Sequence, residues 1–188
     1  MIDTITYLKT FLKDRNVASI TPTSSVGVKR VCRKIDFDSS GLIIEYGPAT
    51  GVFTNYLLEN MRADAKLILI ELNKNFSSIL RKTIRDPRVV IVNDSAENVL
   101  EALRKCQESQ ADYILSGIPF FWLRNGLRDK ILCNTYNALK SGGKFLVYQT
   151  CFQTDQHLKV HLDRLFPSVA CKFELMNVPP MRIYEATK

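Results

Sequence analysis

The fold is decided by residues 45–51, which read EYGPATG and stand between an apolar run at 41–44 and a helix-like segment at 52–58. Gly47 and Gly51 allow the backbone to turn sharply and to approach a ligand closely. The backbone amides that open the following helix can receive a polar or anionic group. The stretch therefore predicts a strand, a tight turn and a helix, and the turn is either part of a ligand site or purely structural.

Apolar strand segments alternate with helix-like segments along most of the chain. Strands are expected at residues 42–46, 66–71, 89–93, 111–116 and 144–149, and helices at 51–62, 73–85, 96–108, 123–140 and 154–166. The early strands are continuous apolar runs, as a parallel sheet covered on both faces requires. Residues 171–178 and 182–186 are expected to close the sheet as an antiparallel hairpin. The pattern predicts an α/β fold with a doubly wound, mostly parallel, Rossmann-like sheet.

The beginning of the chain is unusually basic. Residues 1–35 hold seven Lys or Arg against two Asp, which is most of the net charge of +7. Two helices are expected there, at 4–16 and at 25–35, and the first is amphipathic. Such a basic arm suggests an anionic partner, either nucleic acid or an acidic lipid surface, with a merely solvated basic helix as the alternative.

The residues that follow the strands are the candidates for a site, because ligands of doubly wound sheets bind at the carboxyl ends of the strands. The second strand ends at Glu71, followed by Leu72, and an acidic side chain there can accept both hydrogen bonds of a ribose diol. The third strand is followed by Asp94, Ser95 and Ala96, and Asp94 can accept a hydrogen bond from the amine of an adenine. Each feature taken alone has helix capping as its structural alternative.

Three consecutive strand ends thus offer a glycine turn, a diol acceptor and an amine acceptor, in that order. This order resembles the S-adenosylmethionine site of class I methyltransferases. The resemblance implies S-adenosylmethionine as the cofactor, bound by residues from four strand ends: Glu45, Gly47, Pro48, Ala49, Gly51, Glu71, Leu72, Asp94, Ser95, Ala96 and Ser116. No metal site is expected, because His157 and His161 lie one helical turn apart without an evident third ligand.

The motif Glu-x-Gly-Pro-x-x-Gly is similar to two groups of class I methyltransferases. One group is the ribosomal RNA adenine dimethylases; the other is the bacterial phospholipid N-methyltransferases, with the ornithine-lipid N-methyltransferases beside them. Both usually have Gly where this chain has Ala49. Adenine methylases carry Asn-Leu-Pro-Tyr or Asn-Ile-Pro-Phe after the fourth strand, and the Asn accepts a hydrogen bond from the target amine. Here Gly117 takes that position, and residues 116–120, SGIPF, resemble instead the Ser-Gly-Leu-Pro pattern of the lipid enzymes.

Further stretches resemble the lipid enzymes, namely SITPTSS at 19–25, LKSGGKFLVYQ at 139–149 and NVPP at 177–180. The resemblance implies N-methylation of an amine head group of a membrane lipid, of the phosphatidylethanolamine or ornithine-lipid type. It also implies two regions, a substrate- or membrane-facing lid at 1–38 and the S-adenosylmethionine-binding methyltransferase domain at 39–188. We expect a cytoplasmic protein that associates peripherally with an anionic membrane through its basic amphipathic helix. The five scattered cysteines are expected to be free thiols in a reducing cytosol.

Methyl transfer to nitrogen requires a neutral amine held in line with the methyl group, so the protein mainly positions the two partners. Desolvation or a polar side chain can aid the loss of the amine proton, and Tyr148, Ser116 and Tyr46 are the candidates for that role. Three other functions remain open at this point. They are an adenine-N6 RNA methyltransferase, which the net charge allows, a methyltransferase for another small amine, and a non-catalytic cofactor-binding module.

Overall fold

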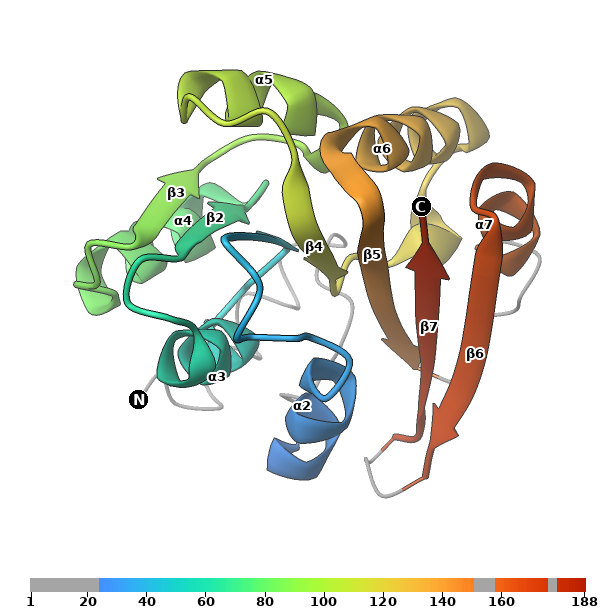
Figure 1. Ribbon diagram of the computed structural model, residues 1–188, viewed down its shortest axis with the longest axis horizontal. Helices are drawn as coiled ribbons and strands as arrows, with labels where there is room; N and C mark the ends of the chain where they lie inside the picture. Colours follow the sequence, from blue (N-terminus) through green and yellow to red (C-terminus); the bar gives the residue numbers. More distant parts are fainter. Residues whose placement is uncertain (1–23, 151–157, 176–178) are drawn as a thin grey trace.

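The computed structural model describes residues 24–150, 158–175 and 179–188 of the chain. In this part, seven strands form one sheet in the order β3-β2-β1-β4-β5-β7-β6 (Figure 1). The strands are β1 (Leu42–Tyr46), β2 (Lys66–Ile70), β3 (Val89–Val92), β4 (Ala111–Ser116), β5 (Leu139–Thr150), β6 (Ser168–Glu174) and β7 (Met181–Thr187). Strands β1 to β5 are parallel, whereas β7 runs antiparallel to both β5 and β6. The predicted fold class is therefore confirmed, including the closing antiparallel hairpin.

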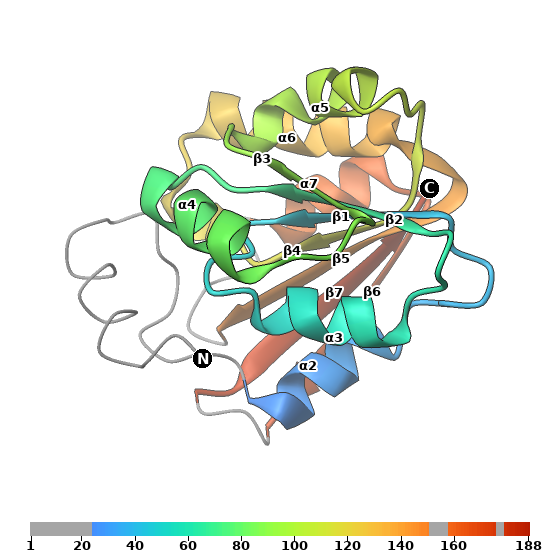
Figure 2. The same cartoon turned by 90° about the vertical axis from the view of Figure 1, so that its left-hand side faces the viewer.

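Helices cover both faces of the sheet (Figure 2). One face is covered by α2 (Ser25–Cys32) and α3 (Val52–Asn60), and the other by α5 (Val99–Lys105), α6 (Asn125–Ala138) and α7 (Lys159–Leu165), while α4 (Lys74–Thr83) packs beside β3. Two short 3-10 helices, η1 (Ala96–Asn98) and η2 (Phe120–Trp122), follow β3 and β4. The expected helix at 4–16, the loop up to residue 23 and the start of NVPP lie outside the described residues.

The strand β1 lies at the centre of the sheet and is buried along its whole length. Its side chains alternate between the two faces: Ile43 joins the core under α2 and α3, whereas Ile44 joins the core under α5, α6 and α7. This explains the continuous apolar runs in the sequence, because a central strand has no solvent-facing side. Val28 and Val31 of α2 belong to the same core as Ile43, so the described part of the N-terminal region packs directly on the sheet.

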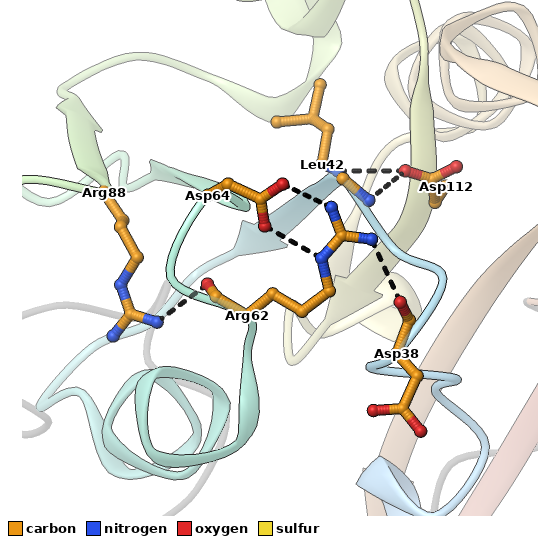
Figure 3. Close-up of polar contacts among 7 residues, drawn as sticks. Asp38, Leu42, Arg62, Asp64, Arg88 and Asp112 are labelled. Atoms are coloured by element: carbon orange, nitrogen blue, oxygen red, sulfur yellow. Dashed lines mark hydrogen bonds and ion pairs between the residues drawn. The ribbon is translucent and has the colours of Figure 1, made fainter.

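The amino edge of the sheet is held together by charged side chains (Figure 3). The carboxylate of Asp112 accepts a hydrogen bond from the backbone N–H of Leu42 (2.9 Å), which fixes the start of β1 against β4. The guanidinium of Arg62 donates to the carbonyl oxygen of Asp38 (3.0 Å), and Arg88 donates to the carbonyl oxygen of Arg62 (3.1 Å). These bonds join the starts of β1 and β4 and the loops before β1, β2 and β3, and they lie at the end of the sheet opposite to the candidate site.

Strand β5 is longer than the sequence predicts. The helix is expected to continue to residue 140 and the strand to begin at 144, but Leu139 already pairs with Ala111 of β4. The register then shifts before Tyr113, and Gly142 adopts a left-handed φ of 76°. The glycine pair therefore forms an irregularity inside one strand rather than a turn before it, which is a common use of glycine in sheets.

Candidate active site

The glycine turn joins the end of β1 to the start of α3. Gly47 and Gly51 have φ values of 65° and 81°, which glycine adopts without strain. The N–H of Gly47 donates to the carbonyl oxygen of Ile70 (2.9 Å), so the turn begins by crossing the end of β2. A Cβ atom at Gly47 would lie 3.0 Å from Cγ2 of Ile118, so the loop after β4 also packs closely against it. The turn is thus enclosed by two neighbouring strand ends.

The middle of the turn is strained. Ala49 has a φ of 49°, in the left-handed region that favours glycine. Its conformation is maintained by two hydrogen bonds. The N–H of Ala49 donates to Oε2 of Glu71 (3.0 Å), and the N–H of Gly51 donates to the carbonyl oxygen of Pro48 (2.8 Å). A glycine, which the families that the motif resembles usually have at this position, would adopt this φ without strain.

Glu71 lies at the end of β2 and is 5 % exposed. Its two carboxylate oxygens accept hydrogen bonds from the N–H groups of Ala49 (3.0 Å) and Asn73 (2.8 Å). The side chain of Asn93, at the end of β3, donates to the carbonyl oxygen of Glu71 (2.7 Å). The structure therefore brings the predicted diol acceptor against the glycine turn and fixes it from both sides. Its neighbour Leu72 points outward and is 53 % exposed.

Glu45 is a buried acid on the α3 side of β1. Its Oε2 accepts a hydrogen bond from the hydroxyl of Thr54 (2.7 Å), whereas its buried Oε1 has no hydrogen-bond partner among the described residues. The pKa of Glu45 is raised to about 8, chiefly by desolvation and also by the negative charge of Glu71, while the hydrogen bond from Thr54 acts in the opposite direction. A buried polar atom without a hydrogen-bond partner lowers stability, so Oε1 has unused hydrogen-bonding capacity for a group bound in the site.

Asp94, Ser95 and Ala96 lie where β3 leads into η1. Oδ1 of Asp94 accepts hydrogen bonds from the N–H of Ser95 (2.7 Å) and from the side chain of Asn98 (2.8 Å). The Ser95 hydroxyl oxygen caps η1 by accepting from the N–H of Glu97 (3.4 Å), and Ala96 is buried. These two hydrogen bonds fix the conformation of the loop. Both are accepted by Oδ1, so neither of them involves Oδ2.

The end of β4 is occupied by an aromatic side chain from β5. A Cβ atom at Gly117 would lie 2.7 Å from Cζ of Tyr148 and would also overlap its hydroxyl. The Tyr148 ring stacks on Phe53 of α3, with 4.2 Å between ring centroids and 20° between planes. Ser116 is fully buried, and its oxygen accepts from the N–H of Ile118 (3.4 Å), so it shapes the loop. Tyr148 thus places a second hydroxyl, from β5, beside the end of β4.

Tyr46 is not brought to the site, which corrects its inclusion among the proton-removal candidates. It is fully buried on the α6 side of the sheet, and its hydroxyl lies 3.2 Å from Oγ1 of Thr135. The Thr135 hydroxyl donates to the carbonyl oxygen of Ile131 (2.7 Å), so Tyr46 is the donor to Thr135. Burial also raises the pKa of Tyr46. Strand geometry explains the error, because adjacent residues such as Glu45 and Tyr46 face opposite sides of a sheet.

The aromatic run after β4 divides between core and surface. Phe120 is fully buried, whereas Phe121 and Trp122 are 42 % and 52 % exposed. Arg128 of α6 fixes η2, because its buried guanidinium donates to the carbonyl oxygens of Phe120 (3.3 Å) and Leu123 (2.8 Å). The sequence did not mark Arg128, nor the roles of Phe53 and Thr54, because none of them stands at a strand end.

In the part of the chain that the structure describes, no group of three or more His, Cys, Asp or Glu side chains is arranged to hold a metal ion. His161 pairs instead with Asp129 (2.9 Å), and His157 lies outside the described residues. The helices in this part include none that is long and apolar enough to cross a membrane.

Comparison with known proteins gives the following relatives. No protein-family model matches the sequence. The ornithine lipid N-methyltransferase of Singulisphaera acidiphila is 24 % identical over 193 residues, which cover 98 % of this chain and 95 % of that protein. The structure is similar to precorrin-6y C5,15-methyltransferase from Geobacter metallireducens, with a TM-score of 0.73, 16 % identity, and coverage of 93 % of this chain and 96 % of that one.

A provisionally assigned S-adenosylmethionine-dependent methyltransferase from Listeria monocytogenes is also similar, with a TM-score of 0.65, 14 % identity, and coverage of 88 % and 99 % of the two chains. The sheet therefore has the fold of class I methyltransferases. The predicted resemblance to these enzymes, and to the ornithine-lipid N-methyltransferases in sequence, is confirmed.

Proposed function

We propose that this protein is an S-adenosylmethionine-dependent N-methyltransferase whose acceptor is the amine head group of a membrane lipid. The observation that carries the choice of acceptor is the pairing of Gly117 with Tyr148. Adenine methylases present an Asn carboxamide at this position, and the Tyr148 ring as placed leaves no room for a side chain there. The full-length similarity to an ornithine lipid N-methyltransferase supports the same class of acceptor, of the ornithine-lipid or phosphatidylethanolamine type.

The residues at the ends of β1 and β2 fit S-adenosylmethionine. Glu71 has a fixed carboxylate for the two ribose hydroxyls, and Glu45 has a buried oxygen that lacks a donor. The turn at Gly47 brings backbone close to the ligand without an intervening side chain. Asp94 would receive the adenine amine. When bound, the cofactor supplies an electrophilic methyl group on a positively charged sulfur.

The protein's part in the reaction is to hold the acceptor nitrogen. Tyr148 is fixed by its stack on Phe53, so its hydroxyl oxygen can accept a hydrogen bond from an N–H of the neutral amine. This bond would hold the nitrogen in place and leave its lone pair available for the displacement. Positioning of this kind is the main source of rate in a displacement between two bound partners. Ser116, which is buried, supports the loop that carries Gly117.

Peripheral membrane association is the second part of the proposal. The basic amphipathic helix expected at 4–16 lies outside the described residues, and its sequence pattern is what supports a role at an anionic membrane surface. It would act as a lid under which the lipid amine enters. The same basic arm also supports the competing function, methylation of adenine in RNA.

The test is a transfer assay with methyl-labelled S-adenosylmethionine. The purified full chain is incubated with mixed bacterial lipid vesicles in one arm and with bulk RNA in the other. Glu71→Gln, which keeps one acceptor oxygen for the backbone, serves as the site variant. We expect label in an organic-soluble amine lipid, with at least a tenfold lower rate in the variant. Label in RNA alone would replace the lipid proposal by the RNA function, and label in neither would point to a small amine.

A further inference from the structure

The large apolar side chains that the described residues expose are unevenly distributed. The four most exposed are Leu175, Phe173, Leu72 and Trp122, at 73 %, 59 %, 53 % and 52 %. Leu72 follows β2, and Trp122 follows β4, so both lie at the carboxyl edge of the parallel strands. Strand β6 runs antiparallel to β7, which is itself antiparallel to β5, so Phe173 and Leu175 at its end lie at the same edge. The residues of the candidate site lie at this edge as well.

A basic groove begins at this edge. It has a volume of about 560 Å³ and runs between α2 and β6. Its lining includes four cations, Arg30, Arg33, Lys34 and Lys172, together with Phe173 and Leu175. Glu174 pairs with Arg30 (3.0 Å) and Glu185 pairs with Lys34 (2.8 Å). Within the described residues, Arg33 and Lys172 are exposed and make no salt bridge, so they give the groove its excess positive charge.

The two features point to one kind of partner. Exposed apolar side chains that share one edge with unpaired cations are typical of proteins that lie on an anionic membrane. Lys172 and Phe173 both line the groove, and the exposed Arg124 follows Trp122 by two residues. A protein partner usually meets a more continuous apolar patch with few charges at its centre. The combination at the carboxyl edge therefore fits lipid acyl chains and anionic head groups better than a protein surface.

We propose that the carboxyl edge of the sheet, from Leu72 and Trp122 to the groove at Lys172 and Leu175, docks on an anionic lipid surface. Leu175 and Trp122 insert among the lipids, while Arg33 and Lys172 contact the head groups. Docking in this orientation turns the Tyr148 end of the site toward the bilayer, so a lipid amine can reach it without leaving the membrane. The link to substrate delivery rests on the proposed function, but docking itself does not.

The experiment is co-sedimentation of the full chain with vesicles, without cofactor. Vesicles of phosphatidylglycerol mixed with phosphatidylcholine are compared with vesicles of phosphatidylcholine alone. The groove variant is Arg33→Gln with Lys172→Gln. Its matched control is Lys82→Gln with Arg85→Gln, which removes the same charge from exposed positions in the last turn of α4 and just beyond it, at the opposite edge. A third variant, Leu175→Asn, tests insertion separately from charge.

A basic residue near an anionic surface contributes about 1 kcal/mol, or roughly fivefold in partitioning. We therefore expect the groove variant to bind anionic vesicles about 30-fold more weakly at low salt, and the control to bind clearly more tightly than the groove variant. Leu175→Asn should weaken binding at both low and high salt. Equal binding of groove variant and control would overturn the docking surface. A second result would also overturn the docking surface, namely a dimeric wild type that becomes monomeric in Leu175→Asn while vesicle binding is unchanged. The edge would then be the contact with a second copy of the chain.

The same variants separate this proposal from the proposed function. With the amine lipid dispersed in detergent, no vesicle surface is needed, so the groove variant should transfer methyl groups at the wild-type rate. If vesicle binding depends on the groove but no amine lipid is methylated under either condition, docking stands and the proposed function fails. If lipid is methylated but the groove variant binds vesicles as its control does, the proposed function stands and the docking surface fails.

Discussion

The Tyr148 side chain fills the space that a side chain on Gly117 would need at the end of β4, since a Cβ atom on Gly117 would lie 2.7 Å from Cζ of Tyr148. The two residues come from neighbouring strands, and Phe53 supports the Tyr148 ring from the other side at 4.2 Å between centroids. A glycine at position 117 and an ordered tyrosine at position 148 therefore depend on each other. The consequence is a site whose hydroxyl comes from β5 rather than from the β4 motif itself.

The dependence can be measured as a coupling free energy. Gly117→Ala should destabilise the protein by about 1–3 kcal/mol, because it forces the Tyr148 ring out of its place. In a Tyr148→Ala background the same change should have little effect, because the overlapping atoms are absent. Urea unfolding of the four proteins in the cycle gives the coupling. Equal effects of Gly117→Ala in both backgrounds would contradict the packing described above.

Tyr148→Phe should slow methyl transfer while leaving the fold intact. The variant retains the stack on Phe53 but loses the hydroxyl that holds the acceptor amine. The loss of one such hydrogen bond is expected to lower the turnover number about tenfold. Cofactor affinity, measured by calorimetry, should stay at the wild-type value because Glu71 and Glu45 are untouched. A variant with unchanged turnover would exclude Tyr148 from the reaction, whatever its effect on stability.

Glu45 should make the stability of the protein depend on pH. Burial raises its folded-state pKa from 4.5 to about 8, so between these pH values the folded state binds a proton that the unfolded state releases. Stability should accordingly fall as pH rises from about 4.5 to 8, by an amount on the order of a few kcal/mol. Glu45→Gln should flatten this part of the curve and be more stable than wild type at pH 8. Glu59→Gln, on the exposed side of α3, is the matched control and should keep the wild-type slope.

Ala49→Gly should stabilise the protein. Ala49 has a φ of 49°, and glycine at that position removes the steric penalty of a side chain in the left-handed region. The gain is expected to be about 0.5–1 kcal/mol, because glycine also loses more backbone entropy on folding. The control is Ala65→Gly, because Ala65 is buried and does not have a positive φ. The melting temperatures of both variants are compared with that of the wild type. We expect Ala49→Gly to raise the melting temperature and Ala65→Gly to lower it. A lower melting temperature for Ala49→Gly would mean that Ala49 is not strained in the turn.

Local sequence patterns were sufficient to predict much of the sheet. Strands β1 and β4 lie where their apolar runs predict them, at Leu42–Tyr46 and Ala111–Ser116. The glycine turn and the acid at the end of β2 were also predicted, because conformational freedom and charge at a strand end are properties of single residues. Predictions at Leu139 and in the helix expected at 96–108 were less accurate, since pairing with β4 and packing on α6 set those boundaries.

The sequence by itself thus determined the α/β class, the order of strands and helices, and the strand ends at which a ligand is expected. Only the tertiary structure decided which side of the sheet each candidate faces. Glu45 and Tyr46 are adjacent in sequence, yet one lies by Thr54 of α3 and the other by Thr135 of α6. The contact of Tyr148 with Gly117 and Phe53 likewise could not be predicted from local sequence patterns. It joins three elements far apart in the chain, and such contacts arise only when helices and strands pack to bury their apolar faces.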